Sequence, residues 1–338
     1  MLDGFEEIGK NNLNVSTKDA KVSDEIRPLT FDDYIGQEEL KKQLKIFIKA
    51  SIKRDKPLAH TLLFGAPGLG KTTLAAIVAN ELGVAIHYVS AASIEKPADL
   101  ASVLMQANNK DIIFIDEIHA LHHRTEEFLH PAMEDFVLDI TIQNGSGNKP
   151  IRVPLEQFTL IGATTKPGSL SKPFRDRFGF QQQLQFYTDE ELSRIIKRTA
   201  KIIKIDVKDD VLLEIAKRSR KTARIANNIL MMCGDFAIAE NNSNLTMDLA
   251  KEAFNSLGVD DVGLNRIDRE LMILLFENFD NKPTGLKNLA SLLQENTETL
   301  ETIIEPYLLQ LGLIQRTNRG RQLTSKGLGY VLLAQKNK

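Results

Sequence analysis

The chain has 338 residues, of which 43 are Lys or Arg and 45 are Asp or Glu, so its formal net charge is −2 and overall charge indicates nothing about nucleic acid. Its length allows two or three domains, and its single cysteine, Cys233, which lies in an apolar helical run and is expected to be a small core residue, excludes internal disulfides and cysteine-rich zinc modules. No apolar run approaches the ~20 residues that span a bilayer, and the first 21 residues lack the apolar core of a signal peptide, so we expect a soluble cytoplasmic protein.

The N-terminal part of the chain is polar before it becomes periodic. Residues 1–23 are aperiodic, and we expect them to form a mobile tail. Residues 26–37 contain Pro28 and Gly36 and are predicted to be an extended lead-in. A helix is expected over residues 40–52, where apolar residues recur with helical spacing.

Residues 65–73 read Gly-Ala-Pro-Gly-Leu-Gly-Lys-Thr-Thr and lie between an apolar run, residues 61–64, and a helical run, residues 74–82. A phosphate-binding loop needs this order of strand, loop and helix, because glycine lets backbone N–H groups turn inward around phosphates. Lys71 is then expected to reach the β- and γ-phosphates, and the Thr72 hydroxyl to ligate Mg²⁺. A flexible glycine loop that fits the pattern by chance is the alternative, and the two flanking elements argue against it.

A second buried strand is predicted over residues 111–117, where four consecutive apolar residues precede Asp116 and Glu117. Carboxylates at the C-terminal end of a strand lie where open α/β sheets bind ligands. We expect Asp116 to hold the Mg²⁺ shell and Glu117 to polarise the water that attacks the γ-phosphate. The alternative is a surface acidic pair that ends a core strand.

A β-hairpin is predicted as an insertion in this α/β region. Residues 138–142 alternate in polarity, residues 144–148 have turn composition, and residues 150–153 return. The apolar residues of the hairpin fit either a core position or a docking surface, and their spacing does not decide between the two. Before the hairpin we expect a strand at residues 85–90 and helices at residues 97–107 and 124–134.

Residues 158–165 are predicted to form a further buried strand that ends in hydroxyls beside Glu117. Thr165 either holds the attacking water or senses the γ-phosphate, or it is an ordinary strand-end cap. The helical segment that follows contains Arg175 and Arg177. These arginines are either surface residues paired with Asp176, or they include an arginine finger that completes the ATP site of a neighbouring subunit.

From residue 188 the pattern becomes helical, which predicts a small domain on the ATPase core. Thr188 and Glu191 form a capping box at its start. Arg224 begins the third helix and is either solvated or folded back onto the bound phosphates. The four helices are expected at residues 188–204, 210–220, 222–239 and 246–257.

A winged-helix pattern, three helices and a β-wing, is predicted beyond a linker at residues 258–261. Glu305 is the last acidic residue, and the arginines on the predicted wing suit phosphate contacts that do not read bases. A basic solvated tail is the alternative. The helices are expected at residues 268–279, 285–293 and 297–311, the wing strands at residues 314–317 and 322–324, and the six cations after Glu305 are Arg316, Arg319, Arg321, Lys326, Lys336 and Lys338.

With these residues placed, the chain resembles the RuvB family, the hexameric AAA+ motor of bacterial Holliday-junction branch migration, from about residue 26 to residue 334. A generic ATPase would share the phosphate-binding loop but not the other matching stretches. These are residues 31–37 (Phe-Asp-Asp-Tyr-Ile-Gly-Gln), 130–136 (His-Pro-Ala-Met-Glu-Asp-Phe), 223–227 (Ala-Arg-Ile-Ala-Asn), 304–307 (Ile-Glu-Pro-Tyr) and 314–321 (Ile-Gln-Arg-Thr-Asn-Arg-Gly-Arg). The resemblance implies an α/β fold with an AAA+ P-loop core and parallel sheet at residues 24–187, with the hairpin at about 138–155, a helical lid at 188–258 and a winged-helix domain at 259–338.

The resemblance also implies roles that spacing leaves open. Thr165 matches the sensor of the third core strand, Arg224 matches the second sensor, and Arg177 matches the finger, with Arg175 close enough to compete. The hairpin from Ile140 to Val153 matches the element that docks a RuvA-type junction-binding protein. The expected nucleotide contacts are Ile26, Arg27, Gly68, Gly70, Lys71, Thr72, Thr73, Glu134, Asp135, Phe136, Arg177, Tyr187 and Arg224; the expected DNA contacts are Arg316 and Arg321, to which the turn position adds Arg319.

Three departures from the family pattern affect these expectations. Lys166 stands where the family usually has arginine, so one phosphate or intersubunit contact is expected to be weaker. His130 replaces a tyrosine. Residues 231–234, Met-Met-Cys-Gly, replace a basic stretch of the lid, so no contact of that stretch is carried over.

We therefore expect an ATP-driven DNA motor, with ATP and Mg²⁺ as cofactors, that drives branch migration of Holliday junctions in recombination and repair. It would work as a homohexameric ring on double-stranded DNA, with a RuvA-type partner and a RuvC-type resolvase. The main alternative is a non-motor AAA+ ATP switch of the clamp-loader or replication-initiator type. A protein-remodelling unfoldase would need an aromatic pore loop, which residues 90–97 lack, and the complete catalytic set argues against a DNA-binding module whose ATP site is only structural.

Overall fold

A parallel five-stranded sheet is the centre of the first part of the chain in the computed structural model, which describes residues 25–144, 147–240 and 243–336. The predicted tail, residues 1–23, lies outside the described residues. The strand order is β2-β3-β6-β1-β7, so the strand that leads into the glycine-rich loop lies inside the sheet. The strands are β1 (Thr61–Phe64), β2 (Ile86–Ser90), β3 (Ile112–Asp116), β6 (Thr159–Thr164) and β7 (Phe180–Gln183).

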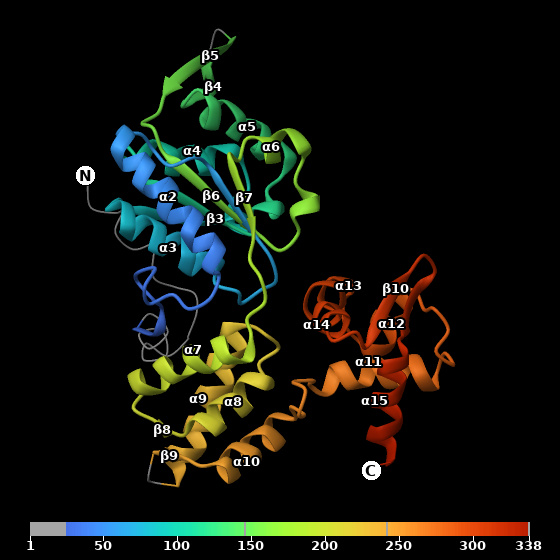
Figure 1. The fold of residues 1–338 in the computed structure, drawn as a ribbon. Helices are drawn as coiled ribbons and strands as arrows, with labels where there is room; N and C mark the ends of the chain where they lie inside the picture. The colour runs from blue at the N-terminus through green and yellow to red at the C-terminus, as the bar shows by residue number, and fades with distance from the viewer. Residues whose placement is uncertain (1–24, 145–146, 241–242, 337–338) are drawn as a thin grey trace, which may run out of the picture.

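Alternation along β3 explains how helices cover both faces of this sheet (Figure 1). Ile112 and Phe114 pack with α2 and α3, whereas Ile113 and Ile115 pack with α4 and α5. A strand covered on both faces has to be apolar throughout, and the continuous apolar run of β3 therefore predicted a buried strand. The helices of this part are α2 (Glu38–Arg54), α3 (Lys71–Leu82), α4 (Pro97–Gln106), α5 (His123–Glu134) and α6 (Lys172–Asp176), with short 3₁₀ turns η1 (Ala91–Ser93), η2 (Ile118–Ala120) and η3 (Pro167–Ser169).

The fifth strand, β7, was not predicted. Its sequence, Phe-Gln-Gln-Gln, contains three polar residues and forms the edge of the sheet, where only one side needs a hydrogen-bonded neighbour. It pairs with β1 in parallel, from Thr61 opposite Phe180 to Phe64 opposite Gln183.

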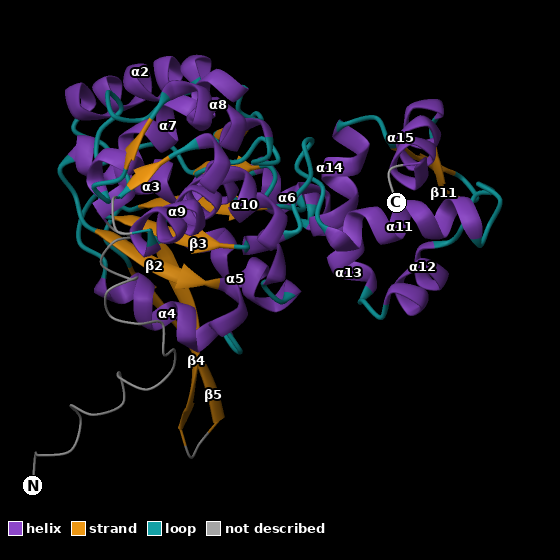
Figure 2. Cartoon of the chain, turned by 90° about the horizontal axis from the view of Figure 1, so that it is seen from below, coloured by secondary structure: helices purple, strands orange, loops and turns teal. Residues whose placement is uncertain are grey.

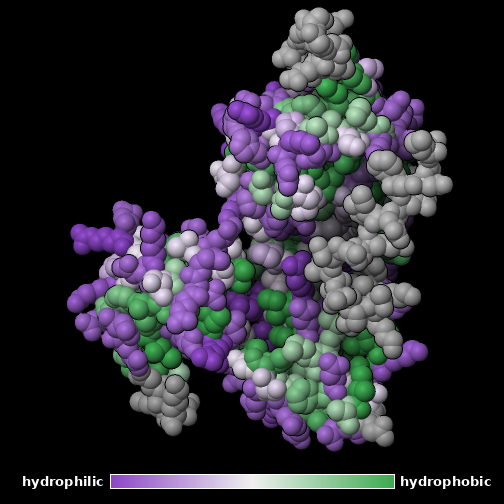
Figure 3. Space-filling model, turned by 180° about the vertical axis from the view of Figure 1, so that it is seen from behind, coloured by the Kyte–Doolittle hydropathy of each residue, from purple (hydrophilic) through white to green (hydrophobic). Residues whose placement is uncertain are grey.

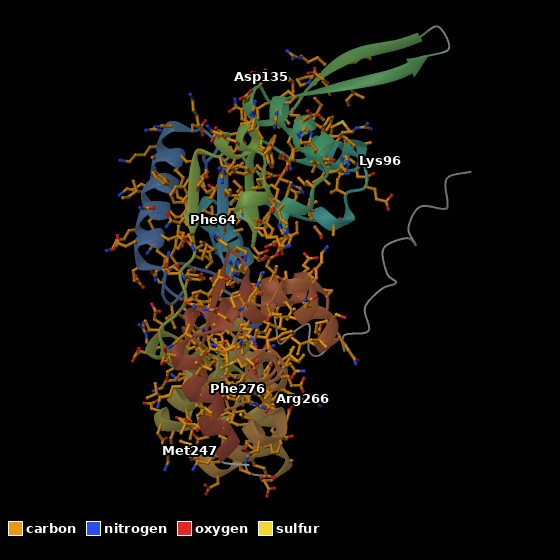
Figure 4. The ribbon with its side chains drawn as sticks, turned by 90° about the vertical axis from the view of Figure 1, so that its right-hand side faces the viewer. Phe64, Lys96, Asp135, Met247, Arg266 and Phe276 are labelled. Atoms are coloured by element: carbon orange, nitrogen blue, oxygen red, sulfur yellow. The ribbon has the colours of Figure 1, made fainter. Side chains whose placement is uncertain are left out.

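The predicted hairpin is present as β4 (Val137–Asn144) and β5 (Gly147–Pro154), and it projects beyond the end of the α/β domain near Asp135 (Figure 4). Its base belongs to the core, because Leu138 is fully buried and Ile140 and Val153 pack on the same cluster. Ile151, which lies directly opposite Ile140 on the other strand, is 37% exposed. The apolar residues at the base of the hairpin therefore belong to the core, which was one of the two alternatives.

The next part of the chain is the predicted helical lid, and its first helix begins at the predicted capping box. Thr188 N–H donates to Glu191 Oε2 at 2.8 Å, and Glu191 N–H donates to Thr188 Oγ1 at 3.1 Å. Cys233 is buried as predicted, and burial raises the pKa of its thiol to about 12. The lid contains α7 (Asp189–Ile202), α8 (Asp209–Lys217), α9 (Ala223–Ala239) and α10 (Met247–Leu257), and a short parallel pair that was not predicted, β8 (Asp206–Val207) and β9 (Asn244–Leu245).

The C-terminal part has the predicted three helical segments and wing, and it ends in a helix, α15, that was not predicted. Val331 of α15 is buried in the core of this domain. Two glycines and polar ends weaken the helical pattern of this segment, so tertiary packing decides its structure. The elements are α11 (Arg266–Glu277), α12 (Leu286–Leu293), α13 (Thr297–Thr299), the π-helical turn η4 (Leu300–Ile304), α14 (Glu305–Gln310), β10 (Ile314–Thr317), β11 (Gly320–Leu323) and α15 (Ser325–Lys336).

A buried ion pair joins the lid to the winged-helix domain. Arg220 Nη2 lies 3.3 Å from Asp268 Oδ1, and the exposed fractions of these side chains are 11% and 0%. The same guanidinium lies 4.9 Å from the ring centroid of Tyr307, whose hydroxyl donates to Val262 O at 2.6 Å. Breaking such a buried pair by removing one partner typically costs about 3–5 kcal/mol, so the two domains are expected to move together.

None of the helices in the described ranges is long and apolar enough to cross a membrane.

A buried carboxylate, Asp111, connects β3 to the start of β2. Asp111 Oδ2 lies 2.9 Å from His87 Nε2 and accepts the Asn108 N–H at 2.9 Å, while Oδ1 accepts the Ala85 N–H at 3.3 Å. Burial alone would raise the pKa of Asp111, but the hydrogen bonds from His87, Asn108 and Ala85 outweigh it and hold that pKa below its usual value.

Asp111→Asn is expected to destabilise the α/β domain by about 1–2 kcal/mol at pH 7, because the amide loses the charged hydrogen bonds. Since the folded pKa is depressed, the contribution is present above the unfolded pKa of about 3.9 and is lost as pH falls through the folded value. Urea unfolding followed between pH 7 and pH 3 should show the difference from wild type shrinking below about pH 4. Asp55→Asn, which removes an exposed partner of Lys110, is the matched control and should have little effect; a difference that stays constant with pH would contradict the expectation.

Candidate functional site

A cavity of about 320 Å³ opens at the C-terminal edge of the sheet, between the glycine-rich loop and the lid. Its volume lies in the range of small-molecule sites. The position fits the rule that open α/β sheets bind ligands at the carboxyl ends of their strands. Of the residues predicted from sequence, it is lined by Ile26, Arg27, Gly68, Gly70, Lys71, Thr72, Thr73, Asp116, Glu117, Tyr187 and Arg224.

Lys71 begins α3 and is almost completely buried under its own loop. Its Nζ donates to Gly65 O at 2.8 Å and to Ala66 O at 3.1 Å. Burial lowers the pKa of Lys71, and the carboxylates of Glu117 and Asp116 oppose this effect. A desolvated cation at a helix N-terminus fits a phosphate, which would supply the missing negative charge.

Two tyrosines hydrogen-bond to the backbone of the glycine-rich loop. The hydroxyls of Tyr187 and Tyr34 both donate to Leu69 O, at 3.0 and 3.3 Å. Burial raises the pKa of both phenols, so both stay protonated donors. Gly70 has φ +95°, and a Cβ there would lie 2.8 Å from the Tyr34 hydroxyl, so this position requires glycine. Tyr34 was not predicted as a site residue, although it lies in one of the stretches that carried the resemblance.

The lid reaches the loop at Arg224, the second residue of α9. Arg224 N–H donates to Gly68 O at 3.4 Å, and a Cβ on Gly68 would lie 2.9 Å from Arg224 Cβ. The positive charge of Arg224 contributes to lowering the pKa of Lys71, so both cations act on the same cavity. Two cations on one cavity indicate a polyanionic ligand.

A second lid arginine, Arg198 of α7, positions the segment that covers the cavity. Its guanidinium donates to Ile26 O and, at 3.2 Å, to Asp33 O. Ile26 is buried, and Ile26 and Arg27, which are expected to contact the nucleotide, both line the cavity. Sequence analysis missed Arg198 because its partners are backbone oxygens more than 160 residues away, which leave no sequence pattern.

The carboxylates at the end of β3 differ in their surroundings. Asp116 Oδ1 accepts the Glu117 N–H at 3.0 Å. Glu117 Oε2 accepts from Thr165 Oγ1 at 3.1 Å and from Thr165 N–H at 3.3 Å, so Thr165 lies beside Glu117 as predicted. His119 Nδ1 also lies 3.1 Å from Glu117 Oε2. Sequence analysis did not single out His119.

The residues on the cavity fit a magnesium ion better than a transition metal. Within the described ranges, no three His, Cys, Asp or Glu side chains are grouped to hold a metal. Mg²⁺ is commonly bound by one or two carboxylates together with substrate phosphates. Thr72 and Asp116, which both line the cavity, are the residues that would hold it.

Arg177 and residues 134–136 do not line this cavity. Arg177 Nη2 lies 3.1 Å from Glu134 Oε1, and Nη1 donates to Pro173 O at 2.6 Å, at a separate open pocket between α5 and α6. Asp135 is exposed nearby, whereas Phe136 is partly buried against the rings of His60 and Phe158. One chain therefore does not bring these predicted nucleotide contacts to its own glycine-rich loop. The pocket is lined by Arg177 and not by Arg175.

The three departures from the family pattern each have a definite position. Lys166 Nζ lies 2.8 Å from Glu298 Oε1 of α13, which Figure 2 shows beside the α/β domain. The ring of His130 stacks on Phe174 with centroids 5.9 Å apart. Met231 lines the cavity and Met232 is 45% exposed. Lys166 thus contacts the winged-helix domain of its own chain.

A buried carboxylate, Glu305, organises the wing. Arg316 Nη2 and Nε lie 2.7 and 2.8 Å from Glu305 Oε2, and Arg321 Nε lies 2.6 Å from Oε1. The Glu305 side chain has no exposed surface. The sequence showed cations with no acidic residue among them, but folding brings Glu305 under two of these arginines. Arg319, on the turn, is exposed, and hydrophilic side chains project from this edge of the domain, at the left of Figure 3.

Comparison with known proteins agrees with this arrangement. Three family models match consecutive parts of the chain: the Holliday junction DNA helicase RuvB P-loop domain at residues 26–184, the RuvB AAA lid domain at residues 187–260, and the RuvB C-terminal winged helix domain at residues 261–332. A solved structure of the Thermotoga maritima RuvB Holliday junction branch migration motor is 39% identical, with TM-score 0.83, covering 91% of this chain and 98% of that one. Two variants of that protein match at 40% identity and TM-score 0.84, covering 91% and 90% of this chain and 98% of theirs. The chain therefore belongs to the RuvB family of Holliday junction branch migration motors.

Proposed function

We propose that each ATP site of this motor is built from two adjoining subunits of a homohexameric ring. One subunit supplies the glycine-rich loop, Glu117 and Arg224, and the next supplies Arg177. The observation that carries this proposal is the separation in one chain: the first residues line one cavity, while Arg177 and Glu134 face another surface. An arginine that cannot serve its own site is available to a neighbour.

Within the site, the residues divide the work. Lys71 and Arg224 would stabilise phosphate charge, and Thr72 and Asp116 would hold Mg²⁺, which when bound neutralises charge on the β- and γ-phosphates. Glu117 would accept the proton of the attacking water, and Thr165 would fix its orientation through Oε2. Tyr187 would keep the loop in shape through Leu69 O.

Movement would pass from the lid to the DNA. Arg224 belongs to α9, and a change in its phosphate contact would change the angle between the lid and the α/β domain. The buried pair of Arg220 and Asp268 supports transfer of this rotation to the winged-helix domain. The wing arginines Arg316, Arg319 and Arg321 would then carry the DNA backbone along.

We also propose the hairpin β4–β5 as the docking element for a RuvA-type junction-binding protein. Its projection beyond the domain and the exposure of Ile151 support this assignment. A RuvC-type resolvase would join the same assembly. Movement of a four-way branch point under steady ATP hydrolysis, measured with and without the partner, tests whether the partner is required.

Glu117→Gln is expected to keep ATP affinity and to lower steady-state turnover by about 10²–10⁴-fold, because the amide cannot accept the proton. Binding is measured with a fluorescent ATP analogue and turnover by phosphate release in the presence of duplex DNA. Glu127→Gln, which changes an exposed carboxylate of α5, is the matched control and should behave as wild type. Turnover retained in Glu117→Gln would remove Glu117 from its role.

Arg177→Ala is expected to lower turnover by about 10³-fold or more without lowering the ATP affinity of the isolated subunit. Mixing it with Glu117→Gln chains should restore activity above that of either parent. An interface is intact when the Arg177→Ala chain supplies Glu117 and the Glu117→Gln chain supplies Arg177, whereas the opposite orientation carries both defects. Phosphate release measured across mixing ratios tests this. Mixtures that only average the two parents would contradict a site shared between subunits.

Arg319→Ala is expected to weaken duplex binding without changing sequence preference and to reduce the salt slope, the change in log affinity per log salt, by about 1. Fluorescence anisotropy at several salt concentrations measures it. Lys251→Ala, an exposed lysine on the lid, should leave the slope unchanged. An unchanged slope in Arg319→Ala would place this residue outside the DNA interface.

A further inference from the structure

His119 lies at the catalytic edge of the sheet, in the 3₁₀ turn η2 directly after Glu117. Its side chain is only 14% exposed. Its Nδ1 lies 3.1 Å from Glu117 Oε2 and 2.9 Å from Thr164 Oγ1. The ring therefore contacts both the proposed catalytic carboxylate and the end of β6, the strand that leads to Thr165.

The hydrogen-bonding capacities of these groups favour one tautomer. An ionised carboxylate only accepts, so a favourable contact with Glu117 requires a proton on Nδ1. Thr164 Oγ1 already accepts the Lys166 N–H at 2.9 Å and, with its second lone pair, can also accept from Nδ1. Burial lowers the pKa of His119, which agrees with a neutral ring that has one N–H to place.

The contacts to the Glu117 carboxylate converge on one oxygen. Thr165 N–H and Thr165 Oγ1 donate to Oε2, and His119 Nδ1, which is also hydrogen-bonded with Thr164 Oγ1, lies 3.1 Å from the same oxygen. No hydrogen bond to Oε1 occurs within the part of the chain that the structure describes. A carboxylate fixed through one oxygen presents the other in a defined direction, which is what a general base for a bound water needs.

The backbone of Glu117 makes this support necessary. Its φ is +47°, in the left-handed region that residues other than glycine rarely adopt. Such a conformation persists where surrounding contacts determine it. Thr165 and His119 hold the Glu117 side chain through the same oxygen, which agrees with a conformation determined by its surroundings.

We propose that His119 is a positioning residue for Glu117: its Nδ1–H holds Oε2, so that Oε1 faces the attacking water. This inference rests on the proposed role of Glu117 as general base. His119 does not touch the reacting atoms, so its contribution is to the orientation of the base and not to ATP binding.

The test compares three variants of the full-length chain assembled on duplex DNA. His119→Asn places an amide N–H near the position of Nδ1, whereas His119→Gln places it near Nε2 and His119→Ala removes it. We expect kcat to fall about 10-fold or more in the Gln and Ala variants, as for loss of a supporting contact, and to stay within about threefold of wild type in the Asn variant. KM and the affinity for a fluorescent ATP analogue should not change in any of them.

Three outcomes would overturn the inference: wild-type kcat in His119→Ala, equal losses in the Asn and Gln variants, or a loss of ATP affinity that parallels the loss of kcat. The Asn and Gln variants keep the test valid if the Ala variant fails to fold. In the double variant Glu117→Gln/His119→Gln, kcat should not fall below that of Glu117→Gln, because the two residues act as one unit. Retained turnover in Glu117→Gln alone would instead refute the role of the base, and so distinguishes failure of the proposed function from failure of this inference.

Discussion

The charges that surround one cavity are the constraint on which the site depends. Burial lowers the pKa of Lys71, the carboxylates of Glu117 and Asp116 oppose this effect, and the charge of Arg224 adds a smaller lowering effect. The two chain segments nevertheless touch, since Arg224 N–H donates to Gly68 O. A phosphate chain between the cations would turn this repulsion into attraction on both sides. The free energy that holds the lid against the loop is therefore sensitive to the number of phosphates present.

Two of the ion pairs that hold the winged-helix domain differ in burial. The buried pair of Arg220 and Asp268 joins it to the lid, whereas the pair of Lys166 and Glu298, with exposed fractions of 30% and 70%, joins it to the α/β domain. An exposed pair contributes little because solvent screens it, whereas breaking a buried pair costs about 3–5 kcal/mol. When the lid rotates, the exposed contact should open first. Because Lys166 follows Thr165 directly, loss of the Lys166–Glu298 contact would free the segment that carries Thr165, which contacts Glu117.

Local sequence patterns predicted most helices and strands and the residues of the glycine-rich loop and the acidic strand. The glycine-rich loop, the acidic strand and the capping box at Thr188 depend on residues close in sequence, and the structure has each where it was expected. The missed interactions join different elements: Arg198 binds backbone oxygens of the lead-in segment, and Glu305 of α14 lies under arginines on the wing. Partners of this kind leave no periodicity. The edge strand β7 was missed because of its local composition, since its three glutamines do not form the apolar pattern that predicts a strand.

The contacts that Arg177 makes within one chain affect how readily it could turn toward the nucleotide of a neighbouring subunit. Its Nη2 contacts Glu134 and its Nη1 contacts Pro173 O, but its Nε is buried without a hydrogen-bond partner in the described structure. A buried unsatisfied donor costs about 1–3 kcal/mol. A guanidinium held this way gains free energy if it turns toward a phosphate that satisfies all its donors, and Glu134 is 56% exposed and can be solvated in exchange. The geometry of a single chain thus favours release of Arg177 once a neighbouring nucleotide comes within reach.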